Sequence, residues 1–241
     1  MARMKDRTKQ ILESGIEYFI RTGEPITSER LYGAYDFGIK PAMIRCELNE
    51  LGSQGFFEQG HPSGGRRPTH KAYRLFVDGF LSGKALSMLL EECLPPAEEL
   101  LSFFLEGERR AFVEDLSDRL DVLGAGYAPK GGELYQSGLS SLLGKLDTDA
   151  KEEFVRVAED LESLGERLDE DRWWERESVW PRVFVGRSPF TKSRHLSVIA
   201  DRLSHAGDDF LVLAIGPNRM DYEKSIAIFK ALEDSLSSMH A

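Results

Sequence analysis

The chain has 241 residues, of which 41% are hydrophobic and 30% are charged, a composition typical of a globular protein rather than of a disordered chain. It has no run of the roughly 18 to 20 apolar residues that a membrane span needs, and no apolar segment follows the charges of its first ten residues. Cys46 and Cys93 belong to no CxxC or Cys/His cluster, which argues against a zinc site and a disulfide framework. We therefore expect a cytoplasmic protein with reduced thiols, no membrane association, no bound metal and no cofactor.

The formal net charge of -10 is unevenly distributed along the chain. Residues 1–86 contain 13 Lys and Arg against 10 Asp and Glu, a net charge of +3, and the remainder contains 18 against 31, a net charge of -13. This asymmetry predicts that only the first part of the chain meets a polyanion and that the acidic part would repel it.

Three helices are predicted in the first 55 residues. Residues 8–21 carry apolar side chains close to a 3.6-residue period, and this helix should end at Gly23 and Pro25. Thr27 or Ser28 should cap a second, short helix over residues 28–36. The third helix should begin near Pro41, because proline is favoured at the first helical position.

The third predicted helix has two different faces. Ile44, Leu48 and Leu51 share one face, and the opposite face is polar or small. That opposite face consists of Ala42, Arg45, Cys46, Asn49 and Ser53. It is short and mixed, so it can enter a groove without steric conflict.

A basic, Gly-rich loop follows the third helix. The segment "HPSGGRRPTHKAYR", residues 61–74, has four Lys or Arg, two His and no acid. Together with the strand-like "GFFEQ" before it, the segment predicts a short hairpin, after which Thr69 should cap a fourth helix over residues 70–81. Three helices, a hairpin and another helix indicate a winged helix-turn-helix over residues 1–85.

The second part, residues 86–241, is expected to be an acidic α+β domain. Helical patterns dominate residues 97–121 and 135–170, separated by the Gly-rich "GAGYAPKGGE", which we interpret as a turn. Strands are predicted at "SVWPRVFVG", "HLSVIADRL" and "DFLVLAIG", the last two as an antiparallel hairpin, before a helix over residues 222–239.

Chemical motifs in the second part favour structural roles. "GAGYAPKGG" lacks the GxxxxGK[ST] spacing of a phosphate loop, and neither His195 nor His205 has partners at metal-ligand spacing. Trp173, Trp174 and Trp180 suggest packing, with an aromatic-lined ligand pocket as the alternative. Because no group of residues suits acid-base or nucleophilic catalysis, we expect no enzyme activity.

The winged helix supplies candidate DNA contacts. In this fold the second helix of the motif enters the major groove, where Arg can pair with guanine, Asn with adenine, and Ala can touch a thymine methyl group. Arg45, Asn49 and Ala42 fit these roles. Lys40 is predicted to contact the DNA backbone at the start of this helix. Phosphate contacts are also predicted for four further residues, Arg66, Arg67, Lys71 and Arg74.

Several segments resemble the HrcA family of bacterial heat-inducible transcription repressors. The resemblance is carried by "GEPITSERL" at 23–31, "GIKPAMIRCELNEL" at 38–51, "GFFEQGHPSGGRRPTHKAYRLFVD" at 55–78, "ELYQSGLSSLL" at 133–143, "VFVG" at 183–186 and "IGPNRMDYEKSI" at 215–226. It implies a homodimeric repressor of chaperone genes that binds the inverted-repeat CIRCE operator on double-stranded DNA and needs the GroE chaperonin to stay active. It also implies a GAF-like second domain.

The chain departs from the family pattern in length and at individual positions. Residues 84–133 are too few for the first half of a GAF-like domain plus the family's inserted dimerisation domain, so we expect a reduced GAF-like domain. We therefore expect the dimer surface to be formed by helices in residues 97–121 and 135–170. Lys40 replaces a capping Ser, Arg67 an apolar residue, Ala72 a Gly, and Cys46 often an Asn. The alternative function is a winged-helix regulator whose second domain binds a small molecule.

Overall fold

The computed structural model describes residues 4–61, 64–146, 151–170 and 179–239. The chain forms two compact units, Met1–Leu81 and Ser82–Ala241. The sequence places the domain boundary after residue 85, and the assignment of DNA binding to the first domain and of dimerisation and regulation to the second stays a prediction. Among the described residues, none of the helices is long and apolar enough to cross a membrane.

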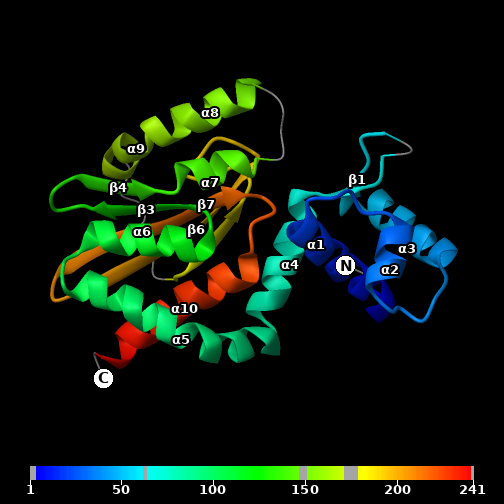
Figure 1. Ribbon diagram of the computed structural model, residues 1–241, viewed down its shortest axis with the longest axis horizontal. Coiled ribbons are helices and arrows are strands. Elements are labelled where there is room, and N and C mark those ends of the chain that lie inside the picture. Colours follow the sequence, from blue (N-terminus) through cyan, green and yellow to red (C-terminus); the bar gives the residue numbers. More distant parts are fainter. Residues whose placement is uncertain (1–3, 62–63, 147–150, 171–178, 240–241) are drawn as a thin grey trace. The chain divides into compact units, whose positions relative to one another are not determined.

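The first unit is a winged helix-turn-helix (Figure 1). Its elements are α1 (Asp6–Thr22), α2 (Ser28–Ala34), α3 (Pro41–Ser53), β1 (Phe57–Glu58), β2 (Arg67–Pro68) and α4 (His70–Leu81). The helices bury the predicted apolar faces. Ile44, Leu48 and Leu51 of α3 and Tyr73 and Phe76 of α4 all lie in the core.

The helix ends follow the local sequence signals. Gly23 ends α1 in the left-handed conformation with φ 69°, and the Thr27 hydroxyl accepts the Arg30 N–H at 3.2 Å to cap α2. Pro41 begins α3, whose N-cap residue Lys40 makes no side-chain capping bond. The Thr69 hydroxyl accepts the Ala72 N–H at 3.4 Å, which confirms Thr69 as the cap of α4.

The wing is fastened to the chain before α2. Strands β1 and β2 pair antiparallel, with Phe57 opposite Pro68. Next to β2, the backbone of Arg66 exchanges two hydrogen bonds with Ile26, of 2.8 and 2.9 Å. These bonds place the Arg66 side chain beside the start of α2, a segment distant in sequence from the wing.

The second unit is α+β, as predicted. Its helices are α5 (Lys84–Leu105), α6 (Arg109–Leu120), α7 (Leu139–Gly144), α8 (Lys151–Glu162), α9 (Leu164–Glu170) and α10 (Tyr222–Ser238). Its strands are β3 (Leu123–Ala128), β4 (Glu133–Ser137), β5 (Arg182–Val185), β6 (Leu196–His205) and β7 (Asp208–Pro217). Among the described residues these strands form one antiparallel sheet in the order β4-β3-β7-β6-β5.

Helices cover both faces of this sheet (Figure 1). The face toward α7, α8 and α9 buries side chains from alternate positions of β3, β6 and β7, including Tyr127, Val198 and Leu213. The other face packs against α6 and α10, and α5 runs along α10. The predicted β6–β7 hairpin is confirmed, and Ala206 (φ 52°) and Gly207 (φ 78°) form its two-residue turn.

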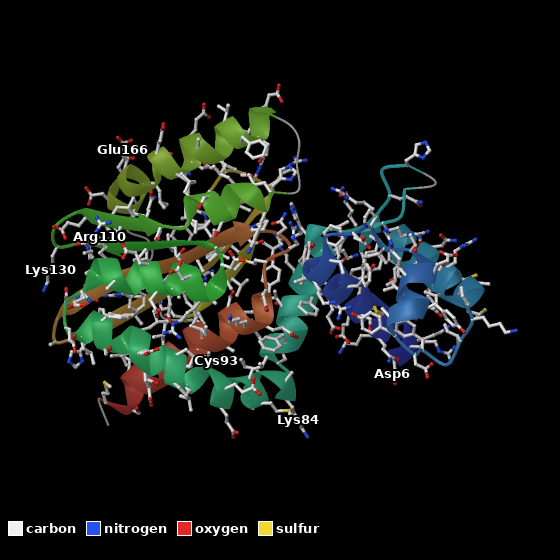
Figure 2. All side chains as sticks on the ribbon, viewed as in Figure 1. Asp6, Lys84, Cys93, Arg110, Lys130 and Glu166 are labelled. Carbon is white, nitrogen blue, oxygen red and sulfur yellow. The ribbon has the colours of Figure 1, made fainter. Side chains whose placement is uncertain are left out.

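The Gly-rich segment between the predicted helical regions is a strand, and here the prediction of a simple turn was wrong. Residues 123–128 form β3, which lies between β4 and β7 in the sheet, and 133–137 form β4, so the turn is confined to the residues between them. A Cβ at Gly124 would lie 2.8 Å from the Val113 carbonyl oxygen of α6. The glycines therefore allow close packing of α6 on β3, whereas Lys130 lies at the tip of the turn (Figure 2).

Helix α5 begins earlier than predicted. The sequence places a helical pattern only from residue 97, whereas α5 begins at Lys84 and continues through Pro95 and Pro96. The residues after the prolines are deeply buried, with Leu100 and Phe104 at 0% and 2% exposure. This burial stabilises the helix enough to override the loss of two backbone donors. Trp180 packs against the core as predicted, and Trp173 and Trp174 lie outside the described residues.

Candidate nucleic-acid interface

Helix α3 exposes the residues predicted to read bases. Ala42, Arg45 and Asn49 are exposed, on the side of the helix opposite the buried Ile44 and Leu48. The helix positions them because the apolar period fixes which face turns to the core. Lys40 is also exposed, at the N-cap of the same helix.

Arg45 is held from the side by the first turn of α2. Its Nη2 donates to Glu29 Oε1 at 2.6 Å, and its Nε lies 3.4 Å from Ser28 Oγ. Both charged side chains remain 61% exposed. The backbone N–H at the start of α2, the Ser28 hydroxyl and the Arg45 guanidinium hold the pKa of Glu29 below its usual range, so the pair is ionised at neutral pH.

Asn49 is held in turn by the wing. The Arg66 Nη2 donates to Asn49 Oδ1, which orients the amide so that its nitrogen remains a donor. Burial, and secondarily the nearby Arg45 charge, lower the pKa of Arg66. The guanidinium still remains protonated at neutral pH because its ordinary pKa is so high. Arg66, which is predicted to contact phosphate, is thus hydrogen-bonded to Asn49, which is predicted to read a base.

These side chains line a polar pocket of about 560 Å³ within the first unit. Its lining comes from the start of α2, the exposed face of α3 and the wing. The lining residues are Thr27, Ser28, Glu29, Arg45, Asn49, Gln59, Gly65 and Arg66. The pocket offers hydrogen-bond donors and acceptors from side chains that are already oriented, which suits recognition of base edges and phosphate oxygens.

The other predicted phosphate contacts lie outside this pocket. Arg67 is exposed on β2, where Glu58 stands opposite it in the strand register. Lys71 donates to the Gln54 carbonyl oxygen at 2.7 Å, and its ammonium lies 4.3 Å from the centre of the Phe56 ring. Arg74 is exposed further along α4. Lys71 is therefore engaged at the end of α3, while the roles of all three residues in DNA contact stay predictions.

Sequence reasoning missed the contribution of α2. The sequence suggests Ser28 only as a candidate helix cap and gives Glu29 no role, yet they meet Arg45 across 17 and 16 positions of the sequence. Glu29 lies in the first turn, where an acid is common because it interacts favourably with the helix dipole. That local explanation hides its contact with α3, and only the helix-turn-helix geometry reveals it.

Within the described ranges, no three His, Cys, Asp or Glu side chains come close enough together to bind a metal ion. The expectations of no metal, no cofactor and no catalytic site stay predictions.

The fold and the exposed face of α3 define the class: this is a winged helix-turn-helix protein with an α+β second unit. The chain is similar to HrcA proteins, which are heat-inducible transcription repressors. It is 41% identical to HrcA of Clostridium tetani over 90 residues, 37% of this chain and 25% of that protein. It is 35% identical to HrcA of Kineococcus radiotolerans over 114 residues, 47% of this chain and 30% of that protein.

These matches confirm the resemblance to HrcA, and each spans less than a third of the relative's length. No protein-family model matches the chain. A crystal structure of a hypothetical protein, solved at 2.2 Å resolution, covers 98% of this chain and 97% of its own, with a TM-score of 0.69 and 14% identity. At that identity the likeness concerns the fold alone, and it extends over both units.

Proposed function

We propose that this protein is a winged-helix transcription regulator and, more specifically, a repressor of heat-shock chaperone genes that binds an inverted-repeat operator of the CIRCE type. The observation that carries the proposal is the cluster of Arg45, Asn49 and Arg66 on the exposed face of α3 and the wing. The similarity to HrcA proteins supports the choice of genes and operator.

In this proposal α3 lies in the major groove and the wing follows the backbone. Arg45 reads a guanine and Asn49 an adenine, with Ala42 against a thymine methyl group. Five residues contact the DNA backbone and contribute affinity without sequence preference: Lys40, Arg66, Arg67, Lys71 and Arg74. A homodimer binds the two half-sites, and the GroE chaperonin is the partner that keeps the repressor active, both by resemblance to HrcA.

The test compares Arg45→Ala with Arg67→Ala. Arg45→Ala should cost about 1 to 3 kcal/mol on the preferred duplex and relax base preference at one position, because a bidentate base contact is lost. Arg67→Ala should weaken binding to all duplexes alike and reduce the slope of log K against log salt by about one, because one phosphate contact is lost. Fluorescence anisotropy at several salt concentrations measures both effects. Equal losses on operator and random DNA for Arg45→Ala would contradict base reading.

A second candidate function is regulation by a small molecule, and a pocket of about 580 Å³ in the second unit favours it. The pocket lies between α8 and the loop before β6. The buried Asp160 carboxylate fixes that loop by accepting the N–H groups of Lys192 at 2.8 Å and Ser193 at 2.9 Å. Arg156, Arg187 and Lys192 line the pocket together with the acids Glu159 and Asp160, and these three cations suit a phosphorylated or carboxylated ligand.

Thermal unfolding distinguishes regulation by a small molecule from regulation by the chaperonin. A panel of phosphorylated and carboxylated metabolites is compared with purified chaperonin, each added to the full chain. A ligand that binds the folded protein raises its melting temperature. Stabilisation by a metabolite that is lost in an Arg187→Ala, Lys192→Ala double variant would favour the ligand-responsive regulator, whereas an effect of chaperonin alone would favour the HrcA-like signal.

A further inference from the structure

The Arg45 guanidinium has two hydrogen-bonding edges, and α2 occupies one of them. Nε faces Ser28 Oγ at 3.4 Å, and Nη2 donates to Glu29 Oε1 at 2.6 Å. The outer edge, formed by Nη1 and the second N–H of Nη2, makes no hydrogen bond to a described residue. A guanidinium is a planar fork, so fixing one edge also fixes the direction of the other.

Ser28 and Glu29, which bind Arg45, are themselves held in place. Ser28 is 3% exposed, and its hydroxyl donates to Glu29 Oε2 at 3.1 Å. Ser28, Glu29 and Arg45 thus form a small ring of hydrogen bonds. The ring rests on the first turn of α2, which Thr27 caps. Glu29 therefore meets Arg45 with an oriented carboxylate rather than with a freely rotating one.

We propose that Glu29 is a positioning residue for base recognition: it holds the Arg45 guanidinium so that its outer edge can meet the two acceptors of a guanine. This inference rests on the proposed function above. A long Arg side chain loses rotamer freedom when it binds a base, and here the contact with α2 has restricted that freedom before binding. The guanine edge presents O6 and N7, which match two parallel N–H groups.

A simpler role for Glu29 would be repulsion, because an exposed acid near DNA disfavours every duplex. The two roles give different results when the side chain is changed. Loss of repulsion raises the affinity for all sequences by the same factor. Loss of positioning lowers the preference for one G·C pair and leaves the remaining positions unchanged.

The experiment uses the full chain and a duplex selected from a randomised pool by the wild-type protein. Affinities are measured for that duplex and for versions with each base pair replaced. Glu29→Ala should lose about tenfold in discrimination at a single G·C pair, since one good base contact accounts for roughly 5- to 150-fold. Glu29→Gln should keep most of the discrimination, because its amide oxygen can still accept from Arg45 Nη2.

A matched control removes a similar charge from α3. Glu50 is exposed, and its carboxylate accepts from Gln54 Nε2 at 3.2 Å rather than from Arg45. Glu50→Ala should leave discrimination at every position unchanged. In an Arg45→Ala background, Glu29→Ala should cause no further loss of discrimination, because its effect passes through Arg45.

Three results would overturn the inference. The first is an equal rise in affinity for all duplexes with Glu29→Ala and Glu29→Gln, with discrimination unchanged. The second is a further loss of discrimination with Glu29→Ala when Arg45 is already absent. The third is a loss of the same size with Glu50→Ala. A wild-type protein that selects no preferred duplex would instead refute the proposed function, and the inference would fall with it.

Discussion

Gly65 shows how strongly one residue of the wing is constrained. It has a φ of 70°, and a Cβ on it would lie 2.8 Å from Pro25 Cβ and 3.1 Å from the Ile26 carbonyl oxygen. It directly precedes Arg66, whose backbone pairs with Ile26. The wing can therefore approach the start of α2 only because this position has no side chain.

Gly65→Ala should destabilise the protein by about 1 to 3 kcal/mol, because alanine is strained at positive φ and has no room here. It should also weaken DNA binding, because Arg66 would move away from Asn49. Urea unfolding and anisotropy measure the two effects. Gly60→Ala is the matched control, since a Cβ at Gly60 would meet nothing within 4 Å. Equal stability of the two variants would contradict this account of the wing.

Asp201 is a buried acid on β6. It is 1% exposed, its Oδ2 has no hydrogen-bond partner among the described residues, and its Oδ1 accepts the Arg202 N–H at 2.7 Å. Burial, and to a smaller extent the nearby Glu233 carboxylate, raise the pKa of Asp201 to about 7, while the Arg202 N–H and the Lys230 ammonium act in the opposite direction.

This raised pKa predicts how stability depends on pH. Between the ordinary pKa of 3.8 and the folded pKa of about 7, the folded state holds a proton that the unfolded state releases. The contribution is therefore fully present below pH 3.8 and is lost as pH rises through about 7. Asp201→Asn should raise the free energy of unfolding at pH 8 by up to a few kcal/mol and change it little at pH 4.

Urea unfolding at both pH values checks this, with the exposed Asp118 of α6 changed to Asn as the control. A variant no more stable than the wild type at pH 8 would argue against a neutral Asp201 in the folded protein. A stabilisation of the same size for Asp118→Asn would show that the effect comes from net charge rather than from burial.

At the scale of elements, the packing of α6 on β3 depends on small residues in the strand. A Cβ on Gly126 would lie 2.2 Å from Phe210 Cζ and 2.8 Å from Val113 Cγ2. Phe210 is itself fully buried and contacts Phe112 in an edge-to-face arrangement with ring centroids 5.7 Å apart. Neither neighbour can move without disturbing the helix.

Gly126→Ala should therefore destabilise the second unit by about 1 to 3 kcal/mol through overpacking. The Gly144→Ala control, at the end of α7, should be nearly neutral because nothing lies within 4 Å of its added Cβ. Differential scanning calorimetry of both variants measures the difference. A melting temperature of Gly126→Ala equal to that of the control would mean that α6 packs less closely than the structure indicates.

The "GPNRMDY" segment shows a second element held by a specific network. Tyr222 lies at the start of α10, is completely buried, and its hydroxyl donates to the Asn218 carbonyl oxygen at 2.8 Å. The Ser197 hydroxyl of β6 donates to Asn218 Oδ1 at 2.8 Å. The segment thus ties the turn after β7 to β6, which gives these residues a structural role.

At the scale of the whole molecule, the proposal requires a dimer. A single helix and wing seldom bind tightly enough alone, and an inverted repeat has two half-sites. Residues 97–121 and 135–170 were the material predicted for the dimer surface. Exposed apolar side chains within these ranges include Leu105 of α5, Leu139 of α7 and Val155 of α8, which are 40%, 48% and 48% exposed.

Sedimentation at micromolar concentration should give the mass of a dimer. Removal of one half-site from the duplex should lower the affinity for DNA by at least a hundredfold, because one of the two recognition helices then has no site. A scrambled half-site of the same length is the matched control for duplex size. A monomer both with and without the complete operator would contradict the proposed mode of binding.

The first unit was largely predictable because its signals are local. The apolar faces of α1, α3 and α4, the cap at Thr27 and the proline that begins α3 all depend on neighbours within a few positions. The exposed positions of Arg45 and Asn49 follow from the same period. The hydrogen bonds of Glu29 to Arg45 and of Arg66 to Asn49 could not be predicted, because they join residues 16 and 17 positions apart in the sequence.

The sequence by itself determined the helices of the winged domain, the β6–β7 hairpin and the polarity of the exposed face of α3, since short-range periodicity and turn chemistry encode these features. Only the tertiary structure decided that residues 123–128 form the strand beside β7 and that α2 and the wing orient the residues on α3. β3 pairs with residues some 90 positions away, and its glycines lower its strand propensity, so its conformation is set by a neighbouring strand and a covering helix rather than by its own residues.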